Sequence, residues 1–263
     1  MKNFDRVADI YDATRELPAF VPNRIADRVV IATRATAETR FLEIGVGTGR
    51  IALPFLERGY RYTGVDISER MMDQLRAKIR DKDVNLTLVN ADITQLPFED
   101  ATFDVVIGVH ILHLVPEWQK AMREVRRVLA PGGYLVLGYE DVAPDDPGHE
   151  IRHQWHEFVR ESGVNLTMRS GSWPAIEAAL IDGGAYMSVY RVAHWVEELQ
   201  PAILLNEQRT RVFSHSWEVP DDVLEAVHKR MVTWTTERYG SLDTVLRSER
   251  EFLVSVSQFP PES

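Results

Sequence analysis

Short apolar runs alternate with amphipathic segments along the first half of the chain. The runs, rich in β-branched and aromatic residues, are 40–44, 61–67, 84–91, 103–110 and 134–139. Between them, residues 51–58, 69–80 and 116–129 have the spacing of helices. Strands that alternate with helices predict a parallel sheet covered on both faces, which is an α/β fold. Ligands of such sheets bind outside the carboxyl ends of the strands.

A glycine loop follows the first apolar run. Gly45, Gly47 and Gly49 stand at alternate positions, so the backbone can turn sharply and approach a ligand closely. A dinucleotide fingerprint needs its third glycine one position later, where Arg50 stands. The loop therefore predicts a cofactor cradle whose spacing argues against a nicotinamide-dependent oxidoreductase.

Acidic residues follow the next two apolar runs. Asp66 ends the second run about 20 residues after the loop, where nucleoside-binding sheets place the acid that accepts the ribose hydroxyls. Ser68 is a sufficient N-cap for the following helix, so capping does not account for Asp66. Asp92 follows the third run, either as a second ligand-binding acid or as a loop residue.

Together, the motifs of residues 40–140 resemble those of class I S-adenosylmethionine (SAM) methyltransferases. They are the glycine loop with Glu43 before it, Asp66, Ala91-Asp92, Phe103-Asp104-Val105-Val106 and Leu129-Ala130-Pro131-Gly132-Gly133. The resemblance is greatest to the methyltransferase type 11 group and to quinone-biosynthesis-like small-molecule enzymes. It implies a Rossmann-like, doubly wound seven-stranded sheet with helical lid insertions. Six strands are parallel, and an antiparallel strand seven lies between strands five and six.

The resemblance implies SAM as the cofactor and S-adenosylhomocysteine as its product. Asp92 and the next residue would hold the adenine, while Tyr11 and Arg15 would lie near the methionine carboxylate. A solvated helix face explains Tyr11 and Arg15 equally well. The implied cofactor-binding residues are Tyr11, Arg15, Glu43, Gly45, Gly47, Gly49, Asp66, Ile67, Met71, Ala91, Asp92, Ile93 and His110.

Methyl transfer requires few protein side chains, because the sulfonium is already electrophilic and the enzyme mainly aligns the acceptor and excludes water. Where an acceptor needs a base, the candidates are His110 after the fourth strand, then His113 and Tyr139. His110 can instead line the adenosyl pocket through its backbone.

The implied organisation adds segments on both sides of a SAM-binding core of residues 40–143. Helices are expected at 148–162, 197–207 and 221–239, and strands six and seven at 185–195 and 251–259. Five tryptophans follow residue 150, either in an apolar lid or in an ordinary core. The segments are a leading helical segment over the cofactor (1–39), a first lid insertion (144–172), the helix and strand six (173–195), a second helical lid (196–250) and strand seven (251–263).

A competing motif, His149-Glu150-Ile151-Arg152-His153, matches the zinc protease pattern. We expect no metal site there, because the pattern needs a third ligand and residues 40–140 already specify a different site. A fortuitous histidine cluster with His156 is the preferred interpretation.

Composition limits the remaining possibilities. The chain has 263 residues, a formal charge of −10 and no cysteine, which excludes disulfides and thiolate chemistry. The charge repels nucleic acid, and no leader or long apolar span is seen, so we expect a cytoplasmic protein that is a monomer or homodimer and acts on a small molecule. The acceptor and the methylated atom are not specified. A SAM-binding protein that transfers no methyl group is the alternative.

Overall fold

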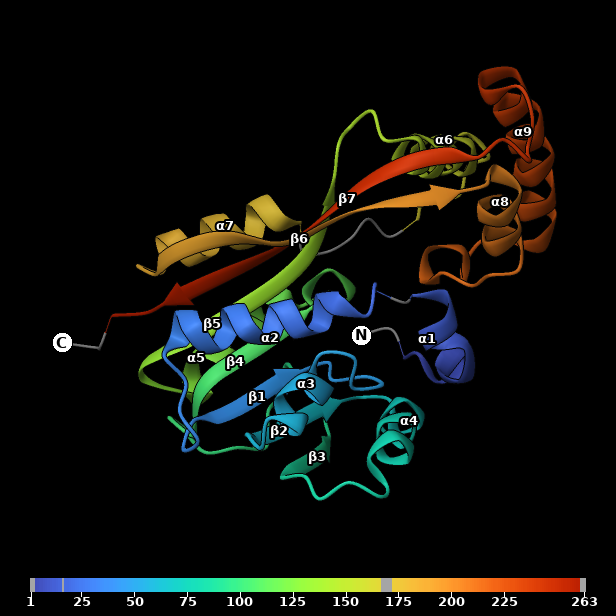
Figure 1. Ribbon diagram of the computed structural model, residues 1–263. Helices are drawn as coiled ribbons and strands as arrows, with labels where there is room; N and C mark the ends of the chain where they lie inside the picture. The colour runs from blue at the N-terminus through green and yellow to red at the C-terminus, as the bar shows by residue number, and fades with distance from the viewer. Residues whose placement is uncertain (1–2, 16, 167–171, 261–263) are drawn as a thin grey trace. The chain divides into compact units, whose positions relative to one another are not determined.

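A computed structural model describes residues 3–15, 17–166 and 172–260. Within these residues, seven strands form one mixed sheet in the order β3-β2-β1-β4-β5-β7-β6, with β7 antiparallel (Figure 1). This order and direction confirm the fold expected from the sequence. The strands are β1 (Arg40–Ile44), β2 (Arg61–Asp66), β3 (Leu86–Asn90), β4 (Phe103–Val109), β5 (Leu129–Val142), β6 (Tyr186–Leu199) and β7 (Leu246–Gln258).

Helices connect the strands and precede them. They are η1 (Asp5–Ile10), α1 (Tyr11–Thr14), α2 (Phe20–Thr33), α3 (Ala52–Glu57), α4 (Glu69–Ile79), η2 (Leu112–Leu114), α5 (Trp118–Val128), α6 (Pro147–Glu161), α7 (Trp173–Asp182), α8 (Pro201–Arg209), η3 (Ser214–Ser216) and α9 (Asp221–Tyr239). In the part of the chain that the structure describes, none of these helices has the length and apolar character to cross a membrane.

The chain divides into two compact units. The first comprises the described residues of Met1–Tyr139, Arg169–Ala193 and Phe252–Ser263. The second comprises those of Glu140–Met168 and His194–Glu251. The chain passes from one unit to the other within β5, β6 and β7.

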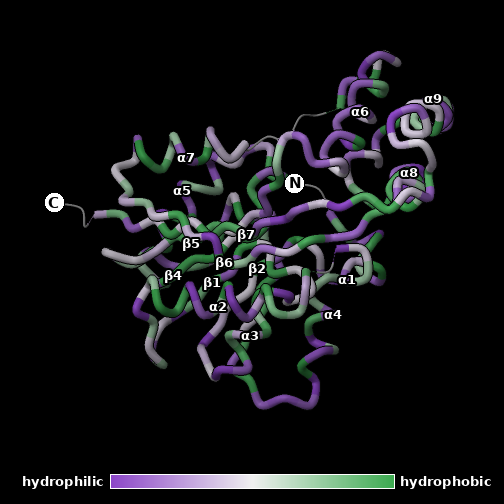
Figure 2. Tube along the Cα trace, turned by 45° about the horizontal axis from the view of Figure 1, so that its top comes forward, coloured by the Kyte–Doolittle hydropathy of each residue, from purple (hydrophilic) through white to green (hydrophobic). Residues whose placement is uncertain are grey.

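Alternating side chains of β1 build two cores on the two faces of the sheet in the first unit. Leu42 and Ile44 belong to a cluster with buried residues of α5 and α7. On the other face, Phe41 packs against Phe55 of α3 with ring centroids 5.1 Å apart. The hydrophobic colour follows the central strands in Figure 2, as expected for a parallel sheet covered on both faces.

The second unit has a core of its own. Ile151, Trp155 and Val159 of α6 are almost fully buried together with Val227 and Met231 of α9. Their spacing places them on one face of each helix. Trp155, which is 1% exposed, belongs to the core of this unit.

One predicted boundary in the second unit is wrong. The helix expected from Glu197 begins at Pro201, and Glu197 to Leu199 continue β6 instead. Pro201 stands in the first turn of α8, where the missing N–H of proline costs no helical hydrogen bond. The proline thus marks the start of the helix more reliably than the polar residues before it do.

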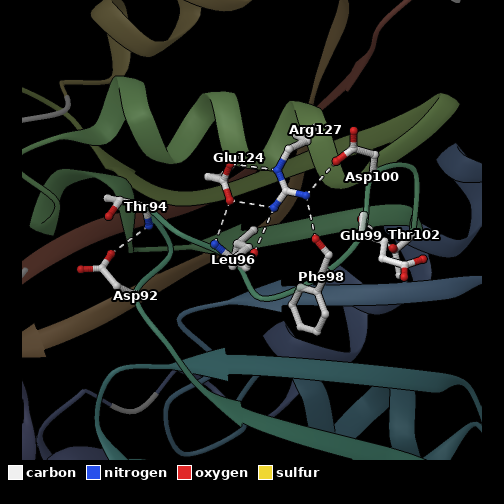
Figure 3. Close-up of polar contacts among 9 residues, drawn as sticks. All are labelled: Asp92, Thr94, Leu96, Phe98, Glu99, Asp100, Thr102, Glu124 and Arg127. Carbon is white, nitrogen blue, oxygen red and sulfur yellow. Dashed lines mark hydrogen bonds and ion pairs between the residues drawn. The ribbon is translucent and has the colours of Figure 1, made fainter.

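Arg127 of α5 fixes the connection between β3 and β4 (Figure 3). Its guanidinium donates to the carbonyl oxygens of Leu96 at 2.9 Å and Phe98 at 2.7 Å. Glu124, one turn earlier on α5, accepts from the Arg127 guanidinium and also from the Leu96 amide at 2.8 Å. The hydrogen bond from Arg127 lowers the pKa of Glu124. This network holds in place the segment that begins with Asp92.

We predict that Arg127→Lys destabilises the protein by about 1–3 kcal/mol, because an ammonium cannot reproduce the planar fork that bonds two carbonyls and the carboxylates of Glu124 and Asp100 at once. Denaturant unfolding measures the change. Arg123→Lys is the matched control, since Arg123 is exposed on the same helix; its effect should stay within about 0.5 kcal/mol. Equal midpoints for the two variants would contradict the structural role of Arg127.

Candidate functional site

The glycine loop after β1 adopts a backbone that side chains rarely permit. Gly45 and Gly49 have φ angles of 75° and 80°. A Cβ on Gly45 would lie 2.7 Å from Ile111 Cδ1, and one on Gly49 would lie 2.3 Å from Leu75 Cδ1. Substitution is therefore excluded by both conformation and space. The close packing also joins the loop to the segment after β4, which carries His110.

Asp66 ties the glycine loop to the end of β2. Its Oδ2 accepts the Gly47 amide at 2.9 Å, and its Oδ1 accepts the Ser68 amide at 2.8 Å. Burial raises the pKa of Asp66, and these hydrogen bonds oppose the rise. The carboxylate is therefore held in a fixed orientation at the carboxyl edge of the sheet. Ser68 in turn caps α4 by accepting the Met71 amide, as the sequence predicted.

Glu43 lies just before the glycine loop and is hydrogen-bonded to Tyr62 of β2. The Tyr62 hydroxyl donates to Glu43 Oε2 at 2.9 Å, and both residues are 2% exposed. Burial raises the pKa of Glu43 to about 8, although the Tyr62 hydrogen bond and the Arg50 charge oppose the rise. Burial also raises the pKa of Tyr62. A buried acid with so high a pKa changes its charge readily when a cation approaches.

The residues after β3 lie beside Asp66. The Ala91 amide donates to the Asp66 carbonyl oxygen at 3.2 Å. Asp92 Oδ1 accepts the Thr94 amide at 2.8 Å, so this acid shapes the turn that follows (Figure 3). Ile93 is fully buried in the core, which leaves its backbone as the part available to a ligand.

Other expected cofactor residues surround the same loop. The Met71 side chain comes within 3.3 Å of the position that a Gly47 Cβ would take. Ile67 supplies a further backbone hydrogen bond to Asp66. The structure thus brings Glu43, the glycines and the segments around Asp66 and Asp92 to the carboxyl edge of β1, β2 and β3.

The three candidate bases lie along the next two strands. His110 follows β4 with a φ of 52°, and its amide donates to the Gly138 carbonyl oxygen at 3.3 Å. Its ring meets Phe252 edge-on at 5.7 Å. A positive φ in a residue other than glycine is uncommon and is found at functional sites. His113 lies within η2, and the Tyr139 ring of β5 packs against Trp173 at a tilt, with centroids 4.2 Å apart.

Three acids of the leading segment form hydrogen bonds or ion pairs with α4, its N-cap Ser68 and the glycine loop. Asp5 accepts from the Ser68 hydroxyl at 2.5 Å, and Asp9 pairs with Arg70 at 2.7 Å. Asp12 accepts from the Thr48 hydroxyl at 2.5 Å and pairs with Lys78 at 2.6 Å. Sequence reasoning missed these contacts, although the spacing of the acids, near four residues, places them on one side of a helix.

Tyr11 and Arg15 belong to the same leading segment. The Arg15 guanidinium lies over the Tyr11 ring at 4.8 Å. Arg50, directly after the glycine loop, donates to the Arg15 carbonyl oxygen. The leading segment thus contacts the glycine loop through Thr48 and the residue after the loop, Arg50.

The motif from His149 to His153 lies on α6 of the second unit, where its Glu150 accepts hydrogen bonds from α9. Tyr239 and Arg238 donate to Glu150 at 2.5 and 2.9 Å, and the Tyr239 hydrogen bond lowers the pKa of Glu150. The rings of His149 and His153 lie 6.4 Å apart. Within the described ranges, no group of three or more ligating side chains could hold a metal ion.

Comparisons with known proteins agree with this geometry. A family model for a methyltransferase domain matches residues 42–137. The chain is 36% identical over 146 residues to the 27-O-demethylrifamycin SV methyltransferase of Amycolatopsis mediterranei, covering 54% of this chain and 53% of that protein. It is 29% identical over 198 residues to the demethylmenaquinone methyltransferase of Renibacterium salmoninarum, covering 74% and 81%.

The fold comparison reaches further along the chain than the sequence match does. The YcgJ protein of Bacillus subtilis has a TM-score of 0.60 at 20% identity, covering 90% of this chain and 98% of that one. The chain spans about half the length of the first curated relatives it matches. Residues 42–137 are thus similar to a methyltransferase domain, and the strand order is that of the class I methyltransferase Rossmann-like fold.

Proposed function

We propose that the protein transfers a methyl group from SAM to a small organic acceptor. The observation that carries this proposal is the Asp66 carboxylate, which is fixed by two backbone amides beside the glycine loop. That arrangement leaves further lone pairs of both oxygens for a pair of adjacent hydroxyls. The family match over residues 42–137 supports the same cofactor.

The position of each residue along the carboxyl edge of the sheet indicates which part of the cofactor it would bind. Asp66 would accept the ribose hydroxyls, and Ile67, Met71 and the segment Ala91–Ile93 would hold the adenine. The loop glycines permit close approach of the backbone. Arg15 binds the methionine carboxylate through its planar guanidinium, with Tyr11 under it.

Chemistry at the methyl group requires alignment more than side-chain reactivity. When bound, the cofactor would supply an electrophilic methyl carbon. The acceptor would attack this carbon in line with the carbon–sulfur bond, and S-adenosylhomocysteine would leave. The protein orients the acceptor and excludes water. Where the acceptor carries a proton, His110 removes it, with His113 and Tyr139 as the other candidates. The positive φ of His110 holds its ring at the end of β4.

The acceptor is proposed to be partly apolar and to be selected by residues 144–172 and 196–250. The tilted ring pair of Tyr139 and Trp173 supplies an aromatic surface at β5. The chain leaves this region for the second unit directly after Tyr139, and the second unit is largely helical. Loops and insertions after the strands of such sheets determine specificity. The leading segment 1–39 is proposed to cover the cofactor.

A SAM-binding protein without transferase activity is the second candidate function. It would bind the cofactor through the same residues. Formation of S-adenosylhomocysteine from SAM in the presence of acceptor pools separates the two functions. Product formation that depends on an acceptor supports the transferase.

We predict that Asp66→Ala weakens binding of SAM and S-adenosylhomocysteine by about 1.5–3 kcal/mol, because charge-assisted hydrogen bonds to both ribose hydroxyls are lost. Calorimetry measures the affinity. Asp81→Ala removes the same charge from an exposed position just after α4 and should bind like the parent protein. Unchanged affinity in Asp66→Ala would overturn the assignment.

A second prediction concerns residues 196–250. If they close over the acceptor, hydrogen exchange in this segment should slow when S-adenosylhomocysteine and an acceptor are both present, because lids that exclude water must also open. Exchange in β1 and β4 serves as the internal control. Protection of residues 196–250 equal to that of the sheet in the free protein, unchanged by ligands, contradicts the lid.

A further inference from the structure

Two side chains of β7 in the second unit bury hydrogen-bond donors that lack an acceptor. The Ser248 hydroxyl and the Arg250 Nε–H are both buried, and neither has a hydrogen-bond partner among the residues that the structure describes. Ser248 is 0% exposed, and the Arg250 side chain is 13% exposed. A buried donor without an acceptor is costly in the free protein, so a ligand oxygen that accepts from it gains affinity.

The two donors lie on one face of β7. Side chains alternate along a strand, so Ser248 and Arg250 share a face, while Glu249 between them belongs to the other face and is exposed. The Cβ atoms of two residues so spaced stand about 6.6 Å apart, which is two strand rises. One oxygen atom about 2.9 Å from each donor therefore spans the gap between them.

The charge around Arg250 is already compensated. Its guanidinium pairs with Glu140 of β5 at 3.5 Å and with Glu197 of β6 at 3.0 Å. These strands lie on either side of β7 in the sheet. Two carboxylates beside one guanidinium leave an excess of one negative charge, which disfavours a further anion. A ligand group that can only donate is disfavoured as well, because the arginine offers no lone pair.

An uncharged carbonyl oxygen meets both conditions, since its two lone pairs can accept from both donors. Ser248 and Arg250 belong to residues 196–250, which are assigned to the acceptor, whereas the residues assigned to the cofactor lie in the first unit. We propose that the methyl acceptor carries an uncharged carbonyl oxygen that accepts from the Arg250 Nε–H and the Ser248 hydroxyl. This inference rests on the proposed function. Access requires the packing over β7 to open, which is the movement proposed for residues 196–250.

Binding of three matched probes to the whole chain, without cofactor, tests the subsite. Acetophenone carries one uncharged carbonyl, ethylbenzene lacks the oxygen, and benzoate carries a carboxylate. In isotope-labelled protein, acetophenone should shift the backbone amide signals of residues 248–250 and should bind about fivefold more tightly than either other probe. Equal affinities for the three probes, or no shift at residues 248–250, would overturn the inference.

Two conservative variants remove one donor each. Ser248→Ala removes the hydroxyl, and Arg250→Lys keeps the charge that faces the two acids but lacks the Nε–H. Each should weaken acetophenone binding by about fivefold and leave ethylbenzene binding unchanged. The matched controls are Ser255→Ala, which removes a buried β7 hydroxyl that also lacks a partner within the described residues, and Arg247→Lys at an exposed position of the same strand. Both controls should bind like the parent protein.

A competition assay connects the subsite to the acceptor. When S-adenosylhomocysteine forms from SAM and an acceptor pool, acetophenone should raise the pool concentration that gives half the maximal rate and leave the maximal rate unchanged. Ser248→Ala should weaken this inhibition by the same factor as it weakens binding. Acetophenone that binds at residues 248–250 without slowing acceptor-dependent turnover would contradict the assignment to the acceptor.

The outcomes separate this inference from the proposed function. If the probes bind alike and Ser248→Ala changes nothing, the inference fails, while the cofactor site still stands where Asp66→Ala weakens binding of SAM. If Asp66→Ala leaves that affinity unchanged and no acceptor pool yields S-adenosylhomocysteine, the proposed function fails whatever the probes do. Should Arg250→Lys not fold, Ser248→Ala and the ranking of the three probes decide the matter.

Discussion

The hydrogen bonds from the Gly47 and Ser68 amides to Asp66 join the three parts from which the candidate site is built. One holds the glycine loop against the end of β2. The other fixes the start of α4, where the Ser68 hydroxyl caps the helix and donates to Asp5 of the leading segment. Without this carboxylate, two buried amides would lose their acceptor, and loop, helix and leading segment would lose their common anchor.

Acids elsewhere around the site act in two ways. Asp9 and Asp12 are exposed and pair with cations of α4, so each ion pair contributes little free energy alone, and together they fix the leading segment in place. Glu43 is instead buried and accepts a hydrogen bond from Tyr62, and burial raises its pKa to about 8. The exposed acids thus attach the leading segment, while the buried acid pairs with Tyr62 inside the first unit.

The sheet and the position of the loop could be predicted because their signals are local. Alternating apolar runs, the spacing of Gly45, Gly47 and Gly49 and the acid after β2 are visible within about 30 residues, the length of one βαβ unit. The Tyr62–Glu43 pair depends on the register of β1 and β2, which no local pattern specifies. The contacts of Asp5, Asp9 and Asp12 depend on docking against residues 36–65 positions later in the chain. Pro201 could have corrected the start of α8, because proline in a first turn is a local signal.

A crystal structure of the protein with S-adenosylhomocysteine tests the account most directly, because it locates the ribose. We expect both ribose hydroxyls within about 3 Å of the Asp66 carboxylate oxygens, with the amides of Gly47 and Ser68 still donating to them. A ribose bound elsewhere, with Asp66 contacting only its backbone partners, would contradict the assignment of this edge of the sheet as the cofactor site.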